Sequence, residues 1–158
     1  YSLDKNNYVV DLYKDHYVNP GLLSTLKTNN KVLNVIANIY AKENNLNNCL
    51  LLNSNKNVVE LTNGNIFLVS GNTVKTPPIL DGCLKGIIRK QVIDIIKLDK
   101  ELQIIEESIS PFELQKADEL FMTNVITGIQ PITKYRKKRY NHSVSKKLLG
   151  NLNEKLVS

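Results

Sequence analysis

The sequence is poor in the residues that build metal centres and disulfide frameworks. Its 158 residues include no tryptophan, one methionine, two histidines and two cysteines. Cys49 and Cys83 form no C-x-x-C pair, and a structural zinc site needs about four clustered Cys or His ligands. We therefore expect no metal site. The two cysteines indicate buried free thiols in a reducing compartment, the cytoplasm.

Long apolar runs and low-complexity segments are also missing. No apolar stretch approaches the roughly 20 residues that a membrane-spanning helix needs, so we expect no membrane association. Hydrophobic residues make up 42% of the chain and charged residues 23%, with 7 glycines and 5 prolines, which is ordinary for a globular protein. A chain of this length can bury its own core. We expect one domain over residues 1–158. Asparagine is unusually frequent.

Acidic residues are absent from one stretch near the C-terminus, and the net charge of +6 originates there. The stretch contains Lys134, Arg136, Lys137, Lys138, Arg139, Lys146 and Lys147. Such a patch can bind nucleic acid or an acidic partner, and a basic nucleic-acid-binding module is a distant alternative for this protein. Tyr135 and Tyr140 are the only aromatic residues in the stretch, and no nucleic-acid-binding motif is visible. We therefore favour a solvated hairpin tip that follows a strand.

The first half of the chain alternates one helix with short β-rich runs. Apolar positions at helical spacing predict a helix from about residue 30 to residue 44. Asn63 and Gly64 predict a tight hairpin turn. Strands are predicted at Tyr8–Tyr13, Cys49–Asn53, Val58–Glu60, Ile66–Val69 and Thr73–Thr76.

The second half places helices between further strands. Ile88, Val92, Ile95 and Ile96 predict an amphipathic helix that starts near Gly86. Ser110, Pro111 and Glu113 form a capping-box pattern that begins a short helix. Strands are predicted at Gln103–Ile109, Leu120–Thr123 and Ile129–Ile132, and an apolar stripe of Val144, Leu148, Leu152 and Leu156 predicts a closing helix. Antiparallel-looking strands with separate helices indicate the α+β class.

Five short motifs occur in a characteristic order. They are Lys27-Thr28-Asn29-Asn30, the run from Glu60 to Phe67, Thr76-Pro77-Pro78, the run from Leu84 to Arg89, and the run from Ala117 to Phe121. A carboxylate beside a turn, such as Glu60, is ordinarily exposed to solvent. The ordered set, however, resembles the K-x-x-N, E-x-x-x-x-N-[IL]-F, T-P-P, L-x-G-I-x-R and A-D-E-[LV]-F motifs of class IV aminotransferases, which are pyridoxal-phosphate enzymes of fold type IV.

The resemblance implies an architecture and an activity. The chain would be the larger C-terminal, cofactor-binding domain of a fold-type IV enzyme, a homodimer whose smaller N-terminal domain is missing from this chain. The activity would be transfer of an amino group between an amino acid and a 2-oxo acid. The alternative within the family is aminodeoxychorismate lyase, which forms 4-aminobenzoate for folate synthesis.

The resemblance also assigns the catalytic residues. Lys27 would carry pyridoxal 5'-phosphate as a Schiff base and move the proton of the substrate. Lys31 is the local competitor, although we expect it to lie on the following helix. Glu60 would face the pyridine nitrogen, where a carboxylate favours the protonated ring.

The phosphate group of the cofactor would lie between two further segments. Gly86, Ile87 and Ile88 begin a predicted helix, whose N-terminal N–H groups favour an anion. Asn124 and Val125 resemble the second phosphate contact, in a turn after a strand. Ile88 and Val125 stand where branched-chain members of the family carry threonines, so two hydroxyl contacts are lost. Leu84 packs either against the cofactor ring or in the core.

Overall fold

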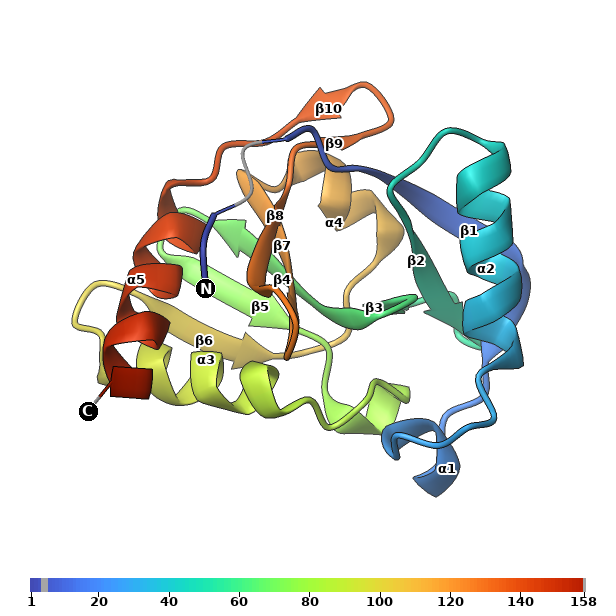
Figure 1. Cartoon of the computed structure of the whole chain (residues 1–158), viewed down its shortest axis with the longest axis horizontal. Helices are drawn as coiled ribbons and strands as arrows, with labels where there is room; N and C mark the ends of the chain where they lie inside the picture. The colour runs from blue at the N-terminus through green and yellow to red at the C-terminus, as the bar shows by residue number, and fades with distance from the viewer. Residues whose placement is uncertain (4–5, 158) are drawn as a thin grey trace.

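The computed structural model describes residues 1–3 and 6–157, and its centre is a mixed sheet (Figure 1). Over these residues the sheet has ten strands, and its main path runs β10-β9-β1-β2-β3-β4-β5-β6. The strand β4 pairs with β3 and β5 and also with β7, which in turn pairs with β8. The branch at β4 brings the end of β3 and the end of β7 to the same part of the molecule.

The strands of the first half follow the predicted runs closely. They are β1 Val9–Val18, β2 Asn48–Asn53, β3 Val58–Leu61, β4 Gly64–Ser70 and β5 Thr73–Thr76. The prediction for β1 was too short, because the strand continues beyond Tyr13. An irregularity between Tyr13 and Val18 lets Val18 pair with Asn53 at the far end of β2.

The strands of the second half include one that is shorter than predicted. They are β6 Gln103–Glu106, β7 Glu119–Asn124, β8 Gly128–Ile132, β9 Lys134–Tyr135 and β10 Lys138–Arg139. The strand β6 stops at Glu106, and Ile109 instead makes an isolated bridge with Val58. Three pairs, β1–β2, β1–β9 and β5–β6, are parallel. The α+β class is confirmed, but the sheet is mixed rather than antiparallel.

Four helices lie where the sequence predicted them, namely α2 Val32–Glu43, α3 Ile87–Leu98, α4 Pro111–Lys116 and α5 Ser143–Val157. The short helix α1 Leu22–Thr25 was not predicted, and a 3-10 turn lies at Ile79–Asp81. The capping box of α4 is present, since the Glu113 carboxylate accepts from the Ser110 N–H at 2.8 Å.

The apolar periodicity was wrong about the buried face of α2, because Ala37 and Ala41 are buried whereas Val32, Ile36 and Ile39 are exposed. The predicted stripe of α5 is wrong at its end, because Leu156 is exposed.

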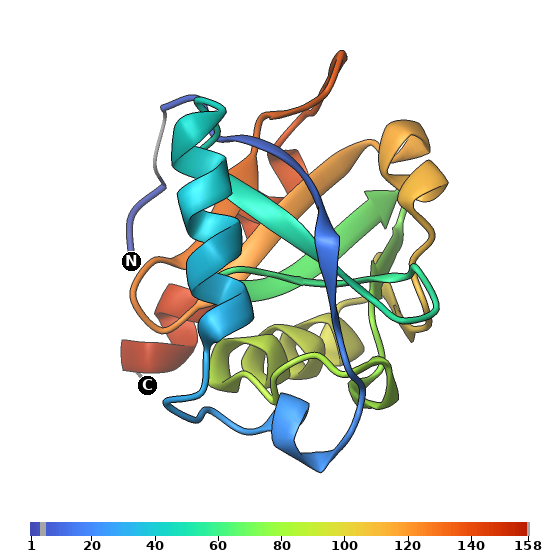
Figure 2. The ribbon, with the colours of Figure 1, turned by 90° about the vertical axis from the view of Figure 1, so that its right-hand side faces the viewer.

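The helices cover different parts of the sheet (Figures 1 and 2). The helix α2 packs on β1 and β2 around Ala37, Ala41 and Cys49. The helices α3 and α5 pack together on another part of the sheet, in a core cluster that includes Phe67 and Phe121. Both cysteines are buried and unpaired. Burial raises the pKa of the Cys49 and Cys83 thiols to about 11, which makes them poor nucleophiles.

The basic stretch is divided between two elements. The strands β9 and β10 form a projecting hairpin whose turn contains Arg136, at a positive φ of 53° and in an ion pair with Asp11 at 3.5 Å. The other end lies on α5, where Lys147 pairs with Asp99 at 2.8 Å and Glu101 at 2.9 Å. The predicted hairpin tip is therefore confirmed for residues 134–139, whereas Lys146 and Lys147 lie on α5. None of the helices in the described residues is long and apolar enough to cross a bilayer.

Candidate active site

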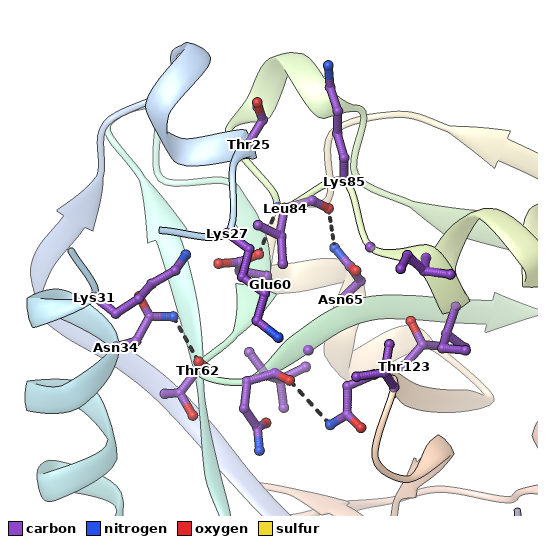
Figure 3. A pocket seen from close by; sticks show the side chains of 18 of the residues that line it. Thr25, Lys27, Lys31, Asn34, Glu60, Thr62, Asn65, Leu84, Lys85 and Thr123 are labelled. Atoms are coloured by element: carbon purple, nitrogen blue, oxygen red, sulfur yellow. Dashed lines mark hydrogen bonds between the residues drawn. The ribbon is translucent and has the colours of Figure 1, made fainter. Parts of the chain in front are cut away.

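One cavity collects every site residue that the sequence predicted. It has a volume of about 550 Å³ and lies between the N-terminal ends of α2 and α3, the β3–β4 turn and the β7–β8 loop (Figure 3). Its walls include Lys27, Glu60, Leu84, Gly86, Ile87, Ile88, Asn124 and Val125. Segments from positions 27 to 125 therefore converge on one space.

Glu60 on β3 is buried rather than exposed, with 6% of its surface accessible. Its Oε2 accepts a 2.9 Å hydrogen bond from the backbone N–H of Leu84. Burial raises the pKa of the Glu60 carboxyl, while the Leu84 N–H, the charge of Lys31 and the amide of Asn34 act in the opposite direction. A buried carboxylate in such surroundings is stabilised by a cationic ligand.

The turn after Glu60 contains Asn63 and Gly64, as predicted. Leu61 pairs with Gly64, so the two loop residues are Thr62 and Asn63. Gly64 is required because it lies against β7. A Cβ atom there would lie 2.5 Å from Met122 Cγ and 2.7 Å from the Thr123 carbonyl oxygen. Glycine therefore allows β7 to pass close to β4 at the floor of the cavity.

Lys27 lies in the connection between α1 and α2, and both Lys27 and Glu60 line the cavity (Figure 3). The backbone N–H of Lys85 donates to the carbonyl of Thr25 at 3.2 Å, which ties this connection to the segment before α3. Lys31 also lines the cavity. The prediction that Lys31 lies on the helix is wrong, because Lys31 is the N-cap residue that precedes α2.

The N-terminus of α3 faces the same cavity. Gly86 is its N-cap residue, and the N–H groups of the next three residues have no partner within a helix of this kind. A Cβ atom on Gly86 would collide with Oδ1 of Asn65, whose Nδ2 donates to the Leu84 carbonyl at 2.8 Å. Because position 86 is a glycine, the Asn65 side chain can lie against the backbone segment that leads into α3 and bind the Leu84 carbonyl.

The apolar residues of this segment have different environments. Leu84 is half-buried on the cavity wall. Ile87 is 67% exposed, whereas Ile88 is only 5% exposed and belongs to the core cluster beneath α3. Ile88 can therefore contribute its backbone N–H to a ligand, while its side chain packs inside the protein.

The β7–β8 loop is shaped by the side chain of Asn124. Its Oδ1 accepts hydrogen bonds from the N–H of Ile126 at 3.0 Å and from the N–H and hydroxyl of Thr127 at 2.8 and 3.0 Å. Its Nδ2 donates to the Asn63 carbonyl at 3.2 Å. Asn124 therefore orders the loop and joins it to the β3–β4 turn, which leaves the backbone of the loop to face a ligand.

Sequence reasoning assigned no separate role to Asn34 and Asn65 of the cavity, and it named Lys31 only as a competitor of Lys27. Lys31 acts electrostatically on Glu60. Asn34, in the first turn of α2, donates from Nδ2 to the Thr62 carbonyl at 2.8 Å. Asn65 holds the Leu84 carbonyl. Asn65 belongs to the E-x-x-x-x-N motif, so that motif could have identified it, whereas Asn34 depends on a contact between distant segments.

The charged and polar groups of the cavity suit a small molecule with charges at two ends. An amine, a buried carboxylate and a helix N-terminus surround a volume typical of small-molecule sites. Lys27 can form a covalent bond, Glu60 can accept from a protonated ring nitrogen, and the start of α3 can bind a phosphate. Among residues 1–3 and 6–157, no cluster of His, Cys, Asp and Glu could hold a metal ion.

Comparison with known proteins identifies related sequences. The family model described as "Amino-transferase class IV" matches residues 2–135. A Methanocaldococcus jannaschii protein, provisionally named branched-chain-amino-acid aminotransferase, is 36% identical over 107 residues. That match covers 68% of this chain and 37% of the archaeal protein.

Solved structures share the fold. A Legionella pneumophila protein provisionally named 4-amino-4-deoxychorismate lyase superposes with a TM-score of 0.86 at 28% identity, over 98% of this chain and 58% of that protein. The branched-chain aminotransferase of Thermobaculum terrenum in its PLP-bound form gives a TM-score of 0.85 at 23% identity, over 93% of this chain and 50% of that protein. The second likeness shows the fold alone. The chain thus spans about half the length of these structures.

Proposed function

The chain belongs to the class IV aminotransferase family, and from this premise we propose that it is the cofactor-binding part of a pyridoxal-phosphate-dependent aminotransferase. The reaction would move an amino group between an amino acid and a 2-oxo acid. The observation that carries the proposal is the convergence of Lys27, buried Glu60 and the N-terminus of α3 on one cavity. The volume of the cavity and the charges of these groups suit the cofactor.

Lys27 and Glu60 would have different roles toward the cofactor. Pyridoxal phosphate supplies an electron sink that weakens the bonds at the substrate's Cα. Lys27 Nζ would hold the cofactor covalently and would move the proton at the Cα atom of the substrate. The Glu60 carboxylate would accept a hydrogen bond from the ring nitrogen and so favour its protonated form. Because the Leu84 N–H holds one carboxylate oxygen, Glu60 presents the other in a fixed direction.

The phosphate end would depend on backbone groups. The N–H groups at the start of α3 carry the positive end of the helix dipole. The ordered loop after Asn124 supplies the facing wall. Side-chain hydroxyls are absent at Ile88 and Val125, so we assign phosphate binding to the main chain at both positions.

Aminodeoxychorismate lyase is the second candidate, with the same lysine driving release of pyruvate. Two observations favour it: the apolar residues at positions 88 and 125, and the likeness to the Legionella protein named for that activity. The deciding assay offers the whole protein either an amino acid with 2-oxoglutarate, or aminodeoxychorismate alone. Glutamate formation supports the aminotransferase. Pyruvate release without an amino acceptor supports the lyase and overturns the first assignment.

We further propose that a smaller N-terminal domain, absent from these residues, completes the site, and that the whole enzyme is a cytoplasmic homodimer. The chain spans only 37% of its archaeal relative, and exposed apolar residues such as Ile87 and Ile126 surround the cavity. Residues 1–158 alone should therefore fold but lack turnover. Measurable turnover by this fragment would contradict the proposal, and sedimentation of the whole protein tests the dimer.

A further inference from the structure

The two ends of the cavity meet at one small element, the Thr62–Asn63 turn. Both residues line the cavity. Thr62 lies two positions after Glu60, and the Asn63 carbonyl accepts the 3.2 Å hydrogen bond from Asn124 Nδ2. A displacement of this turn would therefore move the carboxylate end and the phosphate end relative to each other.

The turn is held from beneath by Asn48, the first residue of β2, which is 2% exposed. Asn48 Oδ1 accepts from the Thr62 hydroxyl at 2.6 Å and from the Thr62 N–H at 3.2 Å. Asn48 Nδ2 donates to Asn63 Oδ1 at 2.7 Å. One buried amide therefore binds both residues of the turn.

The same amide is itself fixed in orientation. Its oxygen also accepts from the N–H of Cys49 at 2.8 Å, and its nitrogen also donates to the hydroxyl of Tyr8 at 3.0 Å. The acceptor side and the donor side are both occupied, so the amide cannot rotate without breaking several buried hydrogen bonds. Asn48 is thus a rigid support rather than a mobile contact.

We propose that Asn48 is a positioning residue for the cavity, setting Glu60 and Asn124 at the separation and orientation that the cofactor requires. Asn48 does not line the cavity, so it acts through the turn and through Met122 on β7, whose Sδ its Nδ2 contacts at 3.7 Å. The inference rests on the proposed function for the identity of the ligand. Asn48 Nδ2 binds the side chain of Asn63, and the carbonyl of Asn63 in turn binds Asn124. The proposal therefore predicts that loss of the Asn48 Nδ2 group affects mainly the end of the cavity that would bind the phosphate.

The test is Asn48→Asp, which preserves the acceptor oxygen and removes the two donors. The matched control is Asn53→Asp at the other end of β2. Asn53 is also fully buried and also holds a turn, since its Oδ1 accepts from the N–H groups of Asn55 and Asn57, both at 3.0 Å. Its Nδ2 donates to the Asp81 carbonyl at 3.2 Å. Both variants lose donors from a buried asparagine, but only one lies beneath the cavity.

In the whole protein, Asn48→Asp should weaken pyridoxal phosphate binding by about tenfold or more. It should also reduce the visible circular dichroism of the bound cofactor, which reports how asymmetrically the cofactor is held. Asn53→Asp should leave both unchanged at a comparable loss of thermal stability. Equal effects of the two variants on binding and dichroism, or no effect of Asn48→Asp, would overturn the proposal.

Two additions keep the test decisive. If Asn48→Asp does not fold, Thr62→Val removes only the 2.6 Å hydroxyl contact and should give a smaller change in dichroism of the same sign. Unchanged dichroism would contradict the proposal.

A second experiment uses the protein without cofactor. The Asn124 side-chain amide should exchange its protons faster in Asn48→Asp than in Asn53→Asp, and equal exchange would contradict the proposed connection between Asn48 and Asn124. Failure of the unmodified protein to bind pyridoxal phosphate would instead contradict the proposed function.

Discussion

The backbone N–H of Leu84 donates a 2.9 Å hydrogen bond to the carboxylate of Glu60. This bond joins the end of β3 to the segment that leads into α3, two elements that are far apart in the sequence. Asn65 strengthens the same junction from β4 by donating to the Leu84 carbonyl at 2.8 Å. The carboxylate and the helix N-terminus, which would bind opposite ends of the cofactor, therefore cannot move independently.

The charge of Glu60 should reduce the stability of the cofactor-free protein. Because burial raises the pKa of Glu60 in the folded state, folding favours the protonated carboxyl. The buried charge therefore lowers the free energy of unfolding. This loss is absent below the ordinary carboxyl pKa and develops as the pH rises through the raised pKa of Glu60. Glu60→Gln should therefore increase the free energy of unfolding at neutral pH and leave it unchanged in acid. Denaturant titrations at several pH values measure this, and a variant that is less stable at neutral pH would contradict the argument.

The same substitution should impair catalysis. Gln preserves the acceptor for the Leu84 N–H but cannot keep a ring nitrogen protonated. In the whole enzyme, Glu60→Gln should retain the cofactor while turnover falls by a factor on the order of 10² or more. Cofactor content from absorbance and turnover from a coupled assay check the two parts. Unchanged turnover would show that Glu60 has only a structural role.

Ile87 and Ile88 should respond differently to threonine. Ile88 is packed in the core, so Ile88→Thr should lose about 1–3 kcal/mol of unfolding free energy by burying a hydroxyl. Ile87 is exposed, so Ile87→Thr should change stability little. Neither variant should bind the cofactor more tightly, because the backbone N–H groups serve the phosphate. Thermal melts and cofactor titrations compare the pair, and tighter binding by Ile88→Thr would show that its side chain can reach the cavity.

The basic hairpin should be independent of the active site. Lys137 and Lys138 lie on the β9–β10 hairpin and do not line the large cavity. Replacing both by glutamate should leave cofactor affinity and turnover unchanged. If the hairpin instead bound a polyanion as its main function, the unmodified protein would bind heparin with a steep dependence on salt. Such binding together with a catalytically inactive whole protein would favour the nucleic-acid alternative.

Local patterns in the sequence predicted most of the secondary structure. The stripe of Ile88, Val92, Ile95 and Ile96 and the Ser110 capping box depend on near neighbours, and both appear as predicted. The turn that contains Asn63 and Gly64 was also predicted. The reason for Gly64 lies in the crossing strand β7, which the turn pattern alone does not reveal.

The motifs selected residues that line one cavity, but they did not predict the contacts that hold those residues in place. Motif order brought Lys27, Glu60 and the start of α3 together, and the structure places them on one cavity. Burial of Glu60 could not be derived from the residues beside it, because it depends on the Leu84 segment. The roles of Asn48 and Asn34 were also hidden. Each is an ordinary asparagine in the sequence and becomes informative only through its contact with the Thr62–Asn63 turn.

The identity of the cofactor-bearing lysine is the central claim, and one measurement tests it most directly. The whole protein is loaded with pyridoxal phosphate, reduced with borohydride and digested, and the modified peptide is sequenced by mass spectrometry. Lys27 and Lys31 both line the cavity, so each is a chemically possible target. Our account predicts the adduct on Lys27, and its loss in Lys27→Ala but not in Lys31→Ala. An adduct on Lys31, or one retained in Lys27→Ala, would contradict it.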